Sequence, residues 1–296
     1  MSQSSSPTPA APPTAAGTLW IVATPLGNLD DFSPRARQVL GTVGTIAAED
    51  TRTSRKLLPP RATPPRWVAL HEHNEAQVID RLTETLAGGT DVALVSDAGT
   101  PLISDPGYRL VDRAHERGIR VSPVPGPCAA IAALSAAGLP SDRFRFEGFL
   151  PARAGQRRKV LQRLAGATST LLFYVPARDL PEVLAEAAGI LGAERPATVA
   201  RELTKRFETI RRAGLSELAA WVAGDADQQR GEAVLVIAGA PEQAAPAGLD
   251  TALLARELGA ELPPARAAKI LARVSGMDRR AAFRLVETVR QDQHGN

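Results

Sequence analysis

The sequence predicts an α/β protein with two α/β domains and a small C-terminal helical appendage. Short apolar runs typical of β-strands alternate with helical segments from Thr18 onward, and the alternation breaks near residues 138–145 before it resumes. Beyond a linker rich in Ala, Pro and Gly, only helical patterns remain. We therefore expect a disordered tail at 1–17, an N-terminal domain at 18–140, a C-terminal domain at 141–240, and a linker with a basic, helix-turn-helix-like appendage at 241–296.

In the first domain, the alternation of strands and helices predicts strands that run parallel. The expected strands are 19–24, 45–49, 67–70, 92–96 and 121–125. The expected helices are 33–41, 51–58, 74–87 and 105–118, followed by a helix of small residues at 128–139. Ser33-Pro34 is a typical helix start, because serine caps the first amides and proline suits the first helical position.

The second domain repeats the alternation. The expected strands are 170–176, 196–202, 208–213 and 231–240, and the expected helices are 179–190 and 215–223. The strongly apolar segment GEAVLVIAGA (231–240) is typical of a central strand. In the appendage we expect helices at 264–276 and 277–290, joined at Gly276, with Asp278 as the cap of the second helix.

The composition limits the class of protein. The 296 residues are 44% apolar, and the net charge is +3 with arginine far more frequent than lysine. Arginine suits phosphate contacts, although GC-rich codon usage gives the same excess. Cys128 is the single cysteine, which excludes an internal disulfide and a cysteine-based zinc site. The start resembles no signal peptide and no stretch is long and apolar enough for a membrane span, so we expect a cytoplasmic protein.

The segment VALVSDAGTPLISDPG (92–107) carries the first chemical signal. An apolar strand ends at Ser96-Asp97, and a loop of glycines and prolines then brings a second acid, Asp105. Small ligands of open α/β sheets bind outside the carboxyl ends of strands. The loop is therefore a candidate ligand site, although an aspartate that only caps a helix fits the pattern equally well.

Other segments point to the same cleft. Gly27, in the turn after the first strand, leaves room for a ligand near the backbone, and the helix after Pro125-Gly126-Pro127 offers free N–H groups to a carboxylate. A plain turn and a tightly packed core helix are the alternatives. AAEDTRTSRKLL (47–58) is either an acid pair over a basic surface or a capped, solvated helix. HEHNE (71–75) contains possible metal ligands, but no third ligand occurs at a familiar spacing, so we favour a polar loop and expect no metal.

Together these segments closely resemble the tetrapyrrole methylase superfamily and, within it, the family of 16S ribosomal RNA cytidine 2'-O-methyltransferases. The resemblance rests on IVATPLGNLDDFSPRA, IAAEDTRTSRKLL, LHEHNE, VALVSDAGTPLISDPGYRLV, PGPCAAIAALSAAGLPSDRFRFEGFLP, VARELTKRFETI and GEAVLVI, in matching order from 19 to 238. It implies S-adenosylmethionine (AdoMet) in a cleft between two α/β domains, and a homodimer. Carried over by position, the cofactor pocket involves Leu26, Asp97, Thr100, Cys128, Ala129, Phe173 and Ala200.

One segment departs from the family pattern. Where the family usually has Phe-Tyr-Glu-Ser-x-His-Arg, this chain has FYVPARDL (173–180), with Val175 in place of the glutamate and Arg178-Asp179 in place of His-Arg. If that glutamate helps to position substrate or cofactor in the family, this chain is either less active or uses another acid.

The family's reaction is the transfer of a methyl group to a ribose hydroxyl, which requires alignment and benefits from a base. By placement, the candidate bases are Glu49, Asp50, Asp105, Glu147, Glu202 and Lys205, and the sequence does not choose among them. The implied partner is 16S rRNA in the small ribosomal subunit, with phosphate contacts from the basic clusters at 151–163 and 265–290. Their candidate contacts are Arg157, Arg158, Lys159, Arg279, Arg280 and Arg284, and a solvated helical face is the alternative for each cluster.

Two other functions stay open. The chain could methylate carbon atoms of a tetrapyrrole precursor, for which the basic C-terminal helices would be superfluous. It could also be an RNA-binding or ribosome-assembly module with weak or no catalysis, an alternative that the FYVPARDL departure keeps open.

Overall fold

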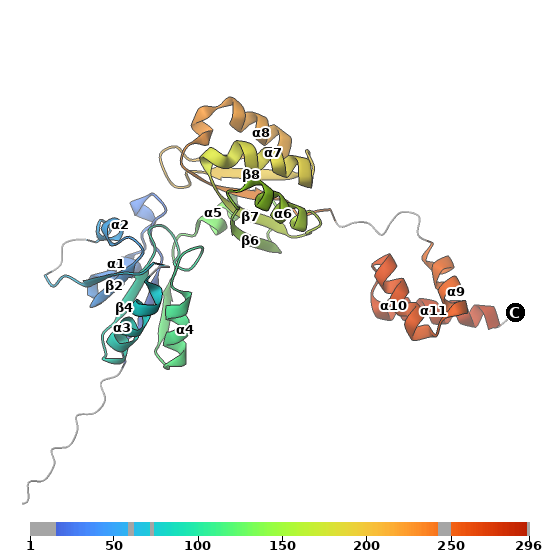
Figure 1. Ribbon diagram of the computed structural model, residues 1–296, viewed down its shortest axis with the longest axis horizontal. Coiled ribbons are helices and arrows are strands. Elements are labelled where there is room, and N and C mark those ends of the chain that lie inside the picture. Colours follow the sequence, from blue (N-terminus) through green and yellow to red (C-terminus); the bar gives the residue numbers. More distant parts are fainter. Residues whose placement is uncertain (1–15, 59–61, 72–73, 242–249, 295–296) are drawn as a thin grey trace, which may run out of the picture. The chain divides into compact units, whose positions relative to one another are not determined.

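The computed structural model of the chain describes residues 16–58, 62–71, 74–241 and 250–294. Their contacts divide the chain into two compact units at Gly239–Ala240. The predicted fold class is confirmed: two sheets carry helices in the first unit, and the second unit is helical (Figure 1). No helix in the described part of the chain is long and apolar enough to cross a membrane.

The first sheet has the strand order β3-β2-β4-β1-β5, and all its pairs are parallel, as predicted. Its strands are β1 (Leu19–Val22), β2 (Thr45–Ala48), β3 (Arg66–Ala69), β4 (Val92–Val95) and β5 (Val121–Val124). Helices α3 (Glu75–Ala87) and α4 (Tyr108–Glu116) pack on one face, and α1 (Pro34–Thr42) packs on the other. With both faces covered, β2 and β4 are buried at every position, which explains their continuous apolar sequences. We call this sheet with α1–α4 the N-terminal lobe.

Local signals explain where the helices of this lobe begin and end. Ser33 accepts a hydrogen bond from the Ala36 amide and Pro34 opens α1, as expected. Two helices are shorter than predicted: α2 covers only Thr51–Arg55, and α4 starts only at Tyr108. Gly107 has φ +124°, a value outside the helical region, so residues 100–107 form a loop instead of the first turns of the helix.

The second sheet has the order β6-β7-β10-β8-β9 and is mixed. Its strands are β6 (Phe144–Phe149), β7 (Thr170–Pro176), β8 (Pro196–Arg201), β9 (Thr209–Gly214) and β10 (Glu232–Ile237). The apolar strand β10 is central, as predicted, and pairs antiparallel with both β7 and β8. Strand β6 was not predicted. Helices α6 (Ala154–Leu164), α7 (Leu180–Leu191) and α8 (Leu215–Gly224) cover one face, and with this sheet they form the C-terminal lobe.

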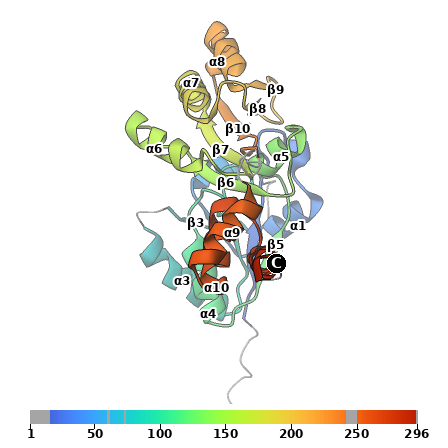
Figure 2. The ribbon, with the colours of Figure 1, turned by 90° about the vertical axis from the view of Figure 1, so that its right-hand side faces the viewer.

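Helix α5 (Ala129–Ala136) covers the other face of the second sheet, although it follows the last strand of the first sheet in the chain. Ala130, Ala133 and Leu134 pack against β7 and β10, and Figures 1 and 2 both show α5 beside these strands. The small side chains let the helix approach the sheet closely, which accounts for the Ala-rich sequence. As a result, the turn that leads into α5 lies at the junction of the two lobes.

The C-terminal unit contains α9 (Thr251–Glu261), α10 (Pro264–Ser275) and α11 (Arg279–His294). Gly276 takes a left-handed conformation at the end of α10, and Asp278 accepts from the amides of Arg280 and Ala281, as predicted. Helix α9 was not predicted, although Asp250 caps it through the amides of Ala252 and Leu253. The unit has its own apolar core, formed by Ala255, Ala267, Ala268, Leu271, Ala282, Val286 and Val289.

Candidate active site

The loop after β4 and the turn before α5 meet in space. The Thr100 hydroxyl donates a hydrogen bond of 2.9 Å to the Pro127 carbonyl. Thr24, after β1, exchanges two backbone hydrogen bonds with Gly99, of 2.8 and 3.1 Å. Gly99 has φ +86°, and a Cβ there would lie 3.1 Å from the Leu26 side chain, so both the conformation and the space favour glycine. Three segments that are distant in sequence are thus fixed at one point.

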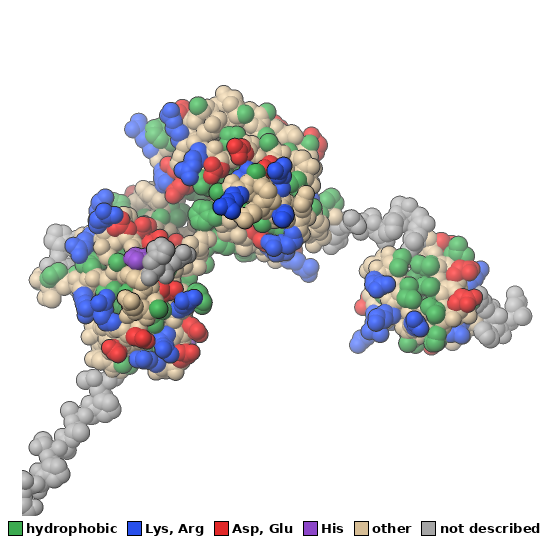
Figure 3. All heavy atoms as spheres, in the orientation of Figure 1, with side chains coloured by type: hydrophobic (Ala, Val, Ile, Leu, Met, Phe, Trp, Pro, Cys, Tyr) green, Lys and Arg blue, Asp and Glu red, His purple; other side chains and the backbone are tan. Residues whose placement is uncertain are grey.

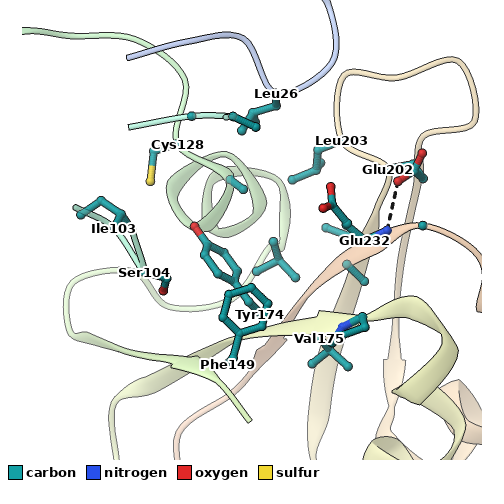
Figure 4. A pocket seen from close by; sticks show the side chains of 18 of the residues that line it. Leu26, Ile103, Ser104, Cys128, Phe149, Tyr174, Val175, Glu202, Leu203 and Glu232 are labelled. Atoms are coloured by element: carbon teal, nitrogen blue, oxygen red, sulfur yellow. Dashed lines mark hydrogen bonds between the residues drawn. The ribbon is translucent and has the colours of Figure 1, made fainter. Parts of the chain in front are cut away.

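These segments and the second sheet enclose a cavity of about 460 Å³, a size typical of small-molecule sites. From the N-terminal side it is lined by Leu26, Asp97, Ala98, Gly99, Thr100, Ile103, Ser104, Asp105, Cys128 and Ala129. From the C-terminal lobe it is lined by Phe149, Tyr174, Val175, Pro176, Arg178, Ala200, Glu202, Leu203, Lys205, Gly231, Glu232, Ala233 and Val234. Figure 4 shows Leu26 and Leu203 across the cavity from Phe149 and Tyr174.

The structure brings most of the expected cofactor residues to this cavity. Leu26, Asp97, Thr100, Cys128, Ala129 and Ala200 all line it. Phe173 does not, because its side chain is fully buried in the core between the second sheet and α6–α8. Successive side chains of a strand point to opposite faces, so the neighbouring Tyr174 faces the cavity in its place.

Acidic side chains gather where the strands of the N-terminal lobe end. Asp97 follows β4, and its Oδ1 accepts a hydrogen bond of 3.2 Å from the amide of Asp50, after β2. Asp105 is partly buried, and this burial, followed by the nearby charge of Glu49, raises its pKa to about 6. A carboxyl group with such a pKa can both accept and release a proton near neutral pH.

Opposite these acids, an ion-pair cluster joins the loop after β8 to β10. The Lys205 ammonium is 2.9 Å from Glu202 and 3.1 Å from Glu232. Burial disfavours the charged form of Glu202, but hydrogen bonds from Lys205 and the Glu232 amide outweigh it and hold the pKa of Glu202 below its usual value. The stem of Lys205 lies against Gly27, where any Cβ would collide with it, so this loop also contacts the N-terminal lobe.

The segment FYVPARDL, which departs from the family pattern, lies beside the cavity. Val175 contributes to the cavity lining at the position of the family's glutamate, although its side chain is buried in the same core cluster as Phe173. Strand β10 places Ala233 opposite Val175 and Glu232 opposite Pro176. Carboxylates therefore lie beside this position, but they come from the paired strand and from the loop after β8. Arg178 also lines the cavity, with its side chain 80% exposed.

Two of the candidate bases are engaged elsewhere. Asp50 caps α2 and pairs with Arg52 at 2.9 Å, and the hydrogen bonds from Arg52 lower its pKa to about 2. Glu147 pairs with Arg145 at 2.7 Å and Arg163 at 3.6 Å. Neither acid lines the cavity. Of the HEHNE segment, Glu72 and His73 lie outside the described residues, and no described group of three His, Cys, Asp or Glu side chains could hold a metal ion.

The structure corrects one expected RNA contact. Arg157 is 3% exposed on the inner face of α6, where its guanidinium is 2.7 Å from Glu186 and 3.1 Å from Glu182 of α7. This arginine stabilises helix packing and is not available to a phosphate. Its neighbours Arg158 and Lys159 are exposed.

The C-terminal unit presents its basic residues differently. Arg279, Arg280 and Arg284 are exposed on α11, and none of them forms an ion pair with any residue that the structure describes. Figure 3 shows several basic side chains on the visible face of this unit. These positions are open to an external phosphate.

Sequence reasoning missed the aromatic wall of the cavity. The ring centroid of Tyr174 is 4.8 Å from that of Phe146 and 5.3 Å from that of Phe149, both in edge contacts. Phe149 is 61% exposed. Burial raises the pKa of Tyr174 to about 12, so its hydroxyl stays protonated. The alternating pattern of FRFEGF was the available signal for this strand.

Comparisons with known proteins agree with this architecture. A sequence profile described as Tetrapyrrole (Corrin/Porphyrin) Methylases matches residues 18–219. Among curated proteins, a Ribosomal RNA small subunit methyltransferase I from Pseudomonas aeruginosa is 54% identical over 265 residues, or 89% of this chain and 94% of the relative. The protein of the same name from Escherichia coli O157:H7 is 48% identical over 268 residues, or 90% and 94%.

Solved structures share the fold at low identity. A cobalt precorrin-4 methyltransferase superposes with a TM-score of 0.55 at 18% identity, over 75% of this chain and 94% of that one. A uroporphyrin-III-C-methyltransferase from Thermus thermophilus gives 0.52 at 21%, over 75% and 94%. The profile match, the close relatives and the cavity between two lobes place the chain in one family. It belongs to the tetrapyrrole (corrin/porphyrin) methylases, within the group of bacterial relatives named ribosomal RNA small subunit methyltransferase I.

Proposed function

We propose that this chain is an AdoMet-dependent methyltransferase that modifies the ribose 2'-hydroxyl of a cytidine in the decoding region of 16S rRNA, on the assembled small subunit. Relatives at about half identity over most of their length are named for methylation of small-subunit rRNA. The cytidine, the hydroxyl and the assembled subunit follow from the resemblance of the motifs. A homodimer in the cytoplasm is part of the same proposal.

The cavity between the lobes is the main observation that supports the binding of AdoMet. Four acids (Asp97, Asp105, Glu202, Glu232) and two bases (Arg178, Lys205) line it, a balance that favours a cationic ligand such as a sulfonium with its ammonium group. Cys128 and Ala129, where α5 begins, line the cavity, and the first amides of a helix suit a carboxylate. Leu26, Leu203 and Val234 offer apolar surface to an adenine.

Bound AdoMet supplies an electrophilic methyl group, and the residues of the chain must hold the acceptor in line with it. The Thr100–Pro127 and Thr24–Gly99 hydrogen bonds fix the loop that carries Asp97. Lys205, packed on Gly27 and paired with Glu202, holds the two lobes together on the opposite side. Such fixed geometry supplies much of the acceleration in a displacement reaction.

The basic side chains with open faces are the proposed RNA contacts. Arg158 and Lys159 on α6, and Arg279, Arg280 and Arg284 on α11, would neutralise phosphates. Aromatic residues make up only 4% of the chain, which argues against extensive base stacking and favours a folded RNA surface as the target.

The acidic lining also argues against a tetrapyrrole substrate, because such precursors carry several carboxylates that the four acids would repel. The likeness to cobalamin and uroporphyrin enzymes is below 25% identity and concerns the fold alone.

A labelling experiment tests the proposal. The chain is incubated with methyl-tritiated AdoMet and either undermethylated small subunits, free 16S rRNA or a tetrapyrrole precursor. We expect label in the subunits, and nuclease digestion should release it as 2'-O-methylcytidine. The phosphodiester next to the labelled ribose should resist alkaline hydrolysis. Label in the tetrapyrrole would overturn the proposal. A folded chain that releases no heat on titration with AdoMet would support the non-catalytic RNA-binding module.

A further inference from the structure

The loop from Thr100 to Gly107 has an unusual backbone. Leu102 and Ser104 take left-handed conformations, with φ of 72° and 70°, which side chains of their kind rarely adopt. Conformations of this type are strained and cluster at functional sites, where the surrounding structure holds them in place. Ser104 directly precedes Asp105, and Leu102 lies three residues before it. The chain therefore accepts strain to set the position of this carboxyl group.

Both ends of the loop are anchored. Thr100 is bonded to Pro127, and Gly107 sits so close to the core that a Cβ there would lie 2.8 Å from the Leu94 side chain. Ser104 and Asp105 line the cavity between these anchors. Asp105 is thus a cavity-facing acid on a rigid support, and rigid placement is what a group that acts on a bound substrate requires.

The surroundings of Asp105 keep its carboxylate basic. Glu49 at the end of β2 and Asp97 at the end of β4 repel a second negative charge, and the Ser96 hydroxyl donates a hydrogen bond that only partly offsets them. The Tyr174 hydroxyl, whose pKa the charge of Asp105 helps to raise, is uncharged at neutral pH and lines the same cavity as Cys128. Burial is the largest cause, and the resulting pKa of about 6 suits proton transfer at neutral pH better than an ordinary carboxylate does.

The other acids of the cavity are less suited to this role. Glu202 is stabilised as an anion by Lys205 and by the Glu232 amide, which makes it a weaker base. Glu232 is paired with the same lysine, and its side chain is 82% exposed. Asp97 accepts a hydrogen bond from the Asp50 amide, and it belongs to the loop proposed to hold the cofactor.

We propose that the carboxylate of Asp105 is the general base of the reaction, an inference that rests on the proposed function. The ribose 2'-oxygen forms a bond to the methyl carbon of AdoMet while the bond from that carbon to sulfur breaks. The electron pair of the broken bond stays on sulfur and leaves S-adenosylhomocysteine, and the hydroxyl proton passes to Asp105. The acid then releases the proton to water.

The test compares D105N and D105E with D112N, a matched change of an exposed aspartate on α4. With saturating AdoMet and undermethylated subunits, we expect D105N to lower the single-turnover rate by at least about 100-fold, the usual contribution of a general base. D105E should restore part of the rate, and the rate of D112N should equal that of the chain without substitutions. Calorimetry should show AdoMet affinities within about threefold for all variants, since the base acts on the acceptor.

Two further readouts separate a catalytic role from a structural one. In the unchanged chain the rate should fall tenfold per pH unit below the pKa of Asp105, and this dependence should vanish in D105N. Bound AdoMet moves that pKa downward, because a nearby positive charge favours the carboxylate. Independently of activity, carboxyl carbon-13 NMR of the ligand-free chain should show a group that titrates near 6 and is absent from D105N.

The outcomes are distinct. If the unchanged chain methylates no RNA, the proposed function fails. If it does so and D105N retains at least a fifth of the rate, Asp105 is not the base. If D105N instead weakens AdoMet binding by tenfold or more, Asp105 is a cofactor ligand, and the inference is overturned as well.

Discussion

The cavity-lining acids of the N-terminal lobe and the buried arginines of the C-terminal lobe use their charges in opposite ways. In the N-terminal lobe, Asp97 and Asp105 extend from strand ends into the cavity. In the C-terminal lobe, Arg157 and Arg201 are 3% and 5% exposed and bind within the fold, Arg157 to two glutamates and Arg201 to Gln228, Thr209 and two carbonyls. A charged residue therefore points to a ligand only when its partners and burial leave it open to one.

The largest expected effect breaks one of these internal contacts. Arg157→Ala removes the cation between Glu182 and Glu186 and leaves the partly buried Glu186, whose side chain is 19% exposed, with only a distant partner in Arg158 at 3.9 Å. Loss of one member of a buried pair typically costs about 3 kcal/mol or more. We expect the free energy of unfolding in urea to fall by about this amount.

Arg158→Ala is the matched control. This neighbour is exposed and only loosely paired, so its removal should change the free energy of unfolding by no more than about 0.5 kcal/mol. Equal destabilisation by the two substitutions would show that the internal pairing of Arg157 has no special weight.

This contrast marks what the sequence could and could not predict. The parallel first sheet followed from its alternating pattern, and the meeting point of the 97–105 loop with the start of α5 followed from the rule that ligands bind at the carboxyl ends of strands. Arg157 and Arg158 are adjacent in a basic run, and only the packing of α6 on α7 separates a structural arginine from an exposed one. A run of like charges contains no information about which member faces inward.

The contribution of the C-terminal lobe to the cavity was also beyond the sequence. Tyr174, Val175, Glu232 and Ala233 come together through the antiparallel register of β7 and β10. Strand direction is set by connection lengths and sheet order, which local patterns do not encode. The choice of Tyr174 over Phe173 depends on which face of β7 meets α5, a long-range contact. The register shift of β6 between Phe146 and Phe149 was likewise not visible in its alternating sequence.

The second prediction concerns the acids that face the cavity. Asp97→Ala removes a carboxylate from the loop fixed by Thr24 and Thr100, and a hydrogen bond to a charged group is worth roughly 1.5–3 kcal/mol. We expect AdoMet affinity, measured by calorimetry, to fall by about 10- to 100-fold while the circular dichroism spectrum is unchanged. Unaltered affinity would remove Asp97 from the cofactor site and weaken the contrast between the lobes.

The third prediction extends the comparison to the C-terminal unit, whose arginines are exposed. Arg279→Ala with Arg280→Ala should leave AdoMet affinity unchanged and weaken binding to small subunits. If both contact phosphates, the slope of log affinity against log salt concentration should become shallower by roughly 1.4–1.8. A loss of cofactor affinity equal to that of Asp97→Ala would contradict this division of roles.

The smallest expected effect tests the cost of burying the Asp105 charge, through the pH dependence of stability. Its folded-state pKa of about 6 lies above the ordinary value of 3.8, so the folded chain holds a proton that the unfolded chain releases. Stability from this group is fully present below pH 3.8 and is lost as the pH rises through about 6. Because the carboxyl is only partly buried, solvent screening reduces the loss to about 1 kcal/mol. D105N abolishes the charge and should therefore raise the melting temperature at pH 7.5 but not at pH 4. If D105N changes the melting temperature by the same amount at both pH values, Asp105 titrates as an ordinary carboxyl group. Its place in the cavity then imposes no cost on the charged form.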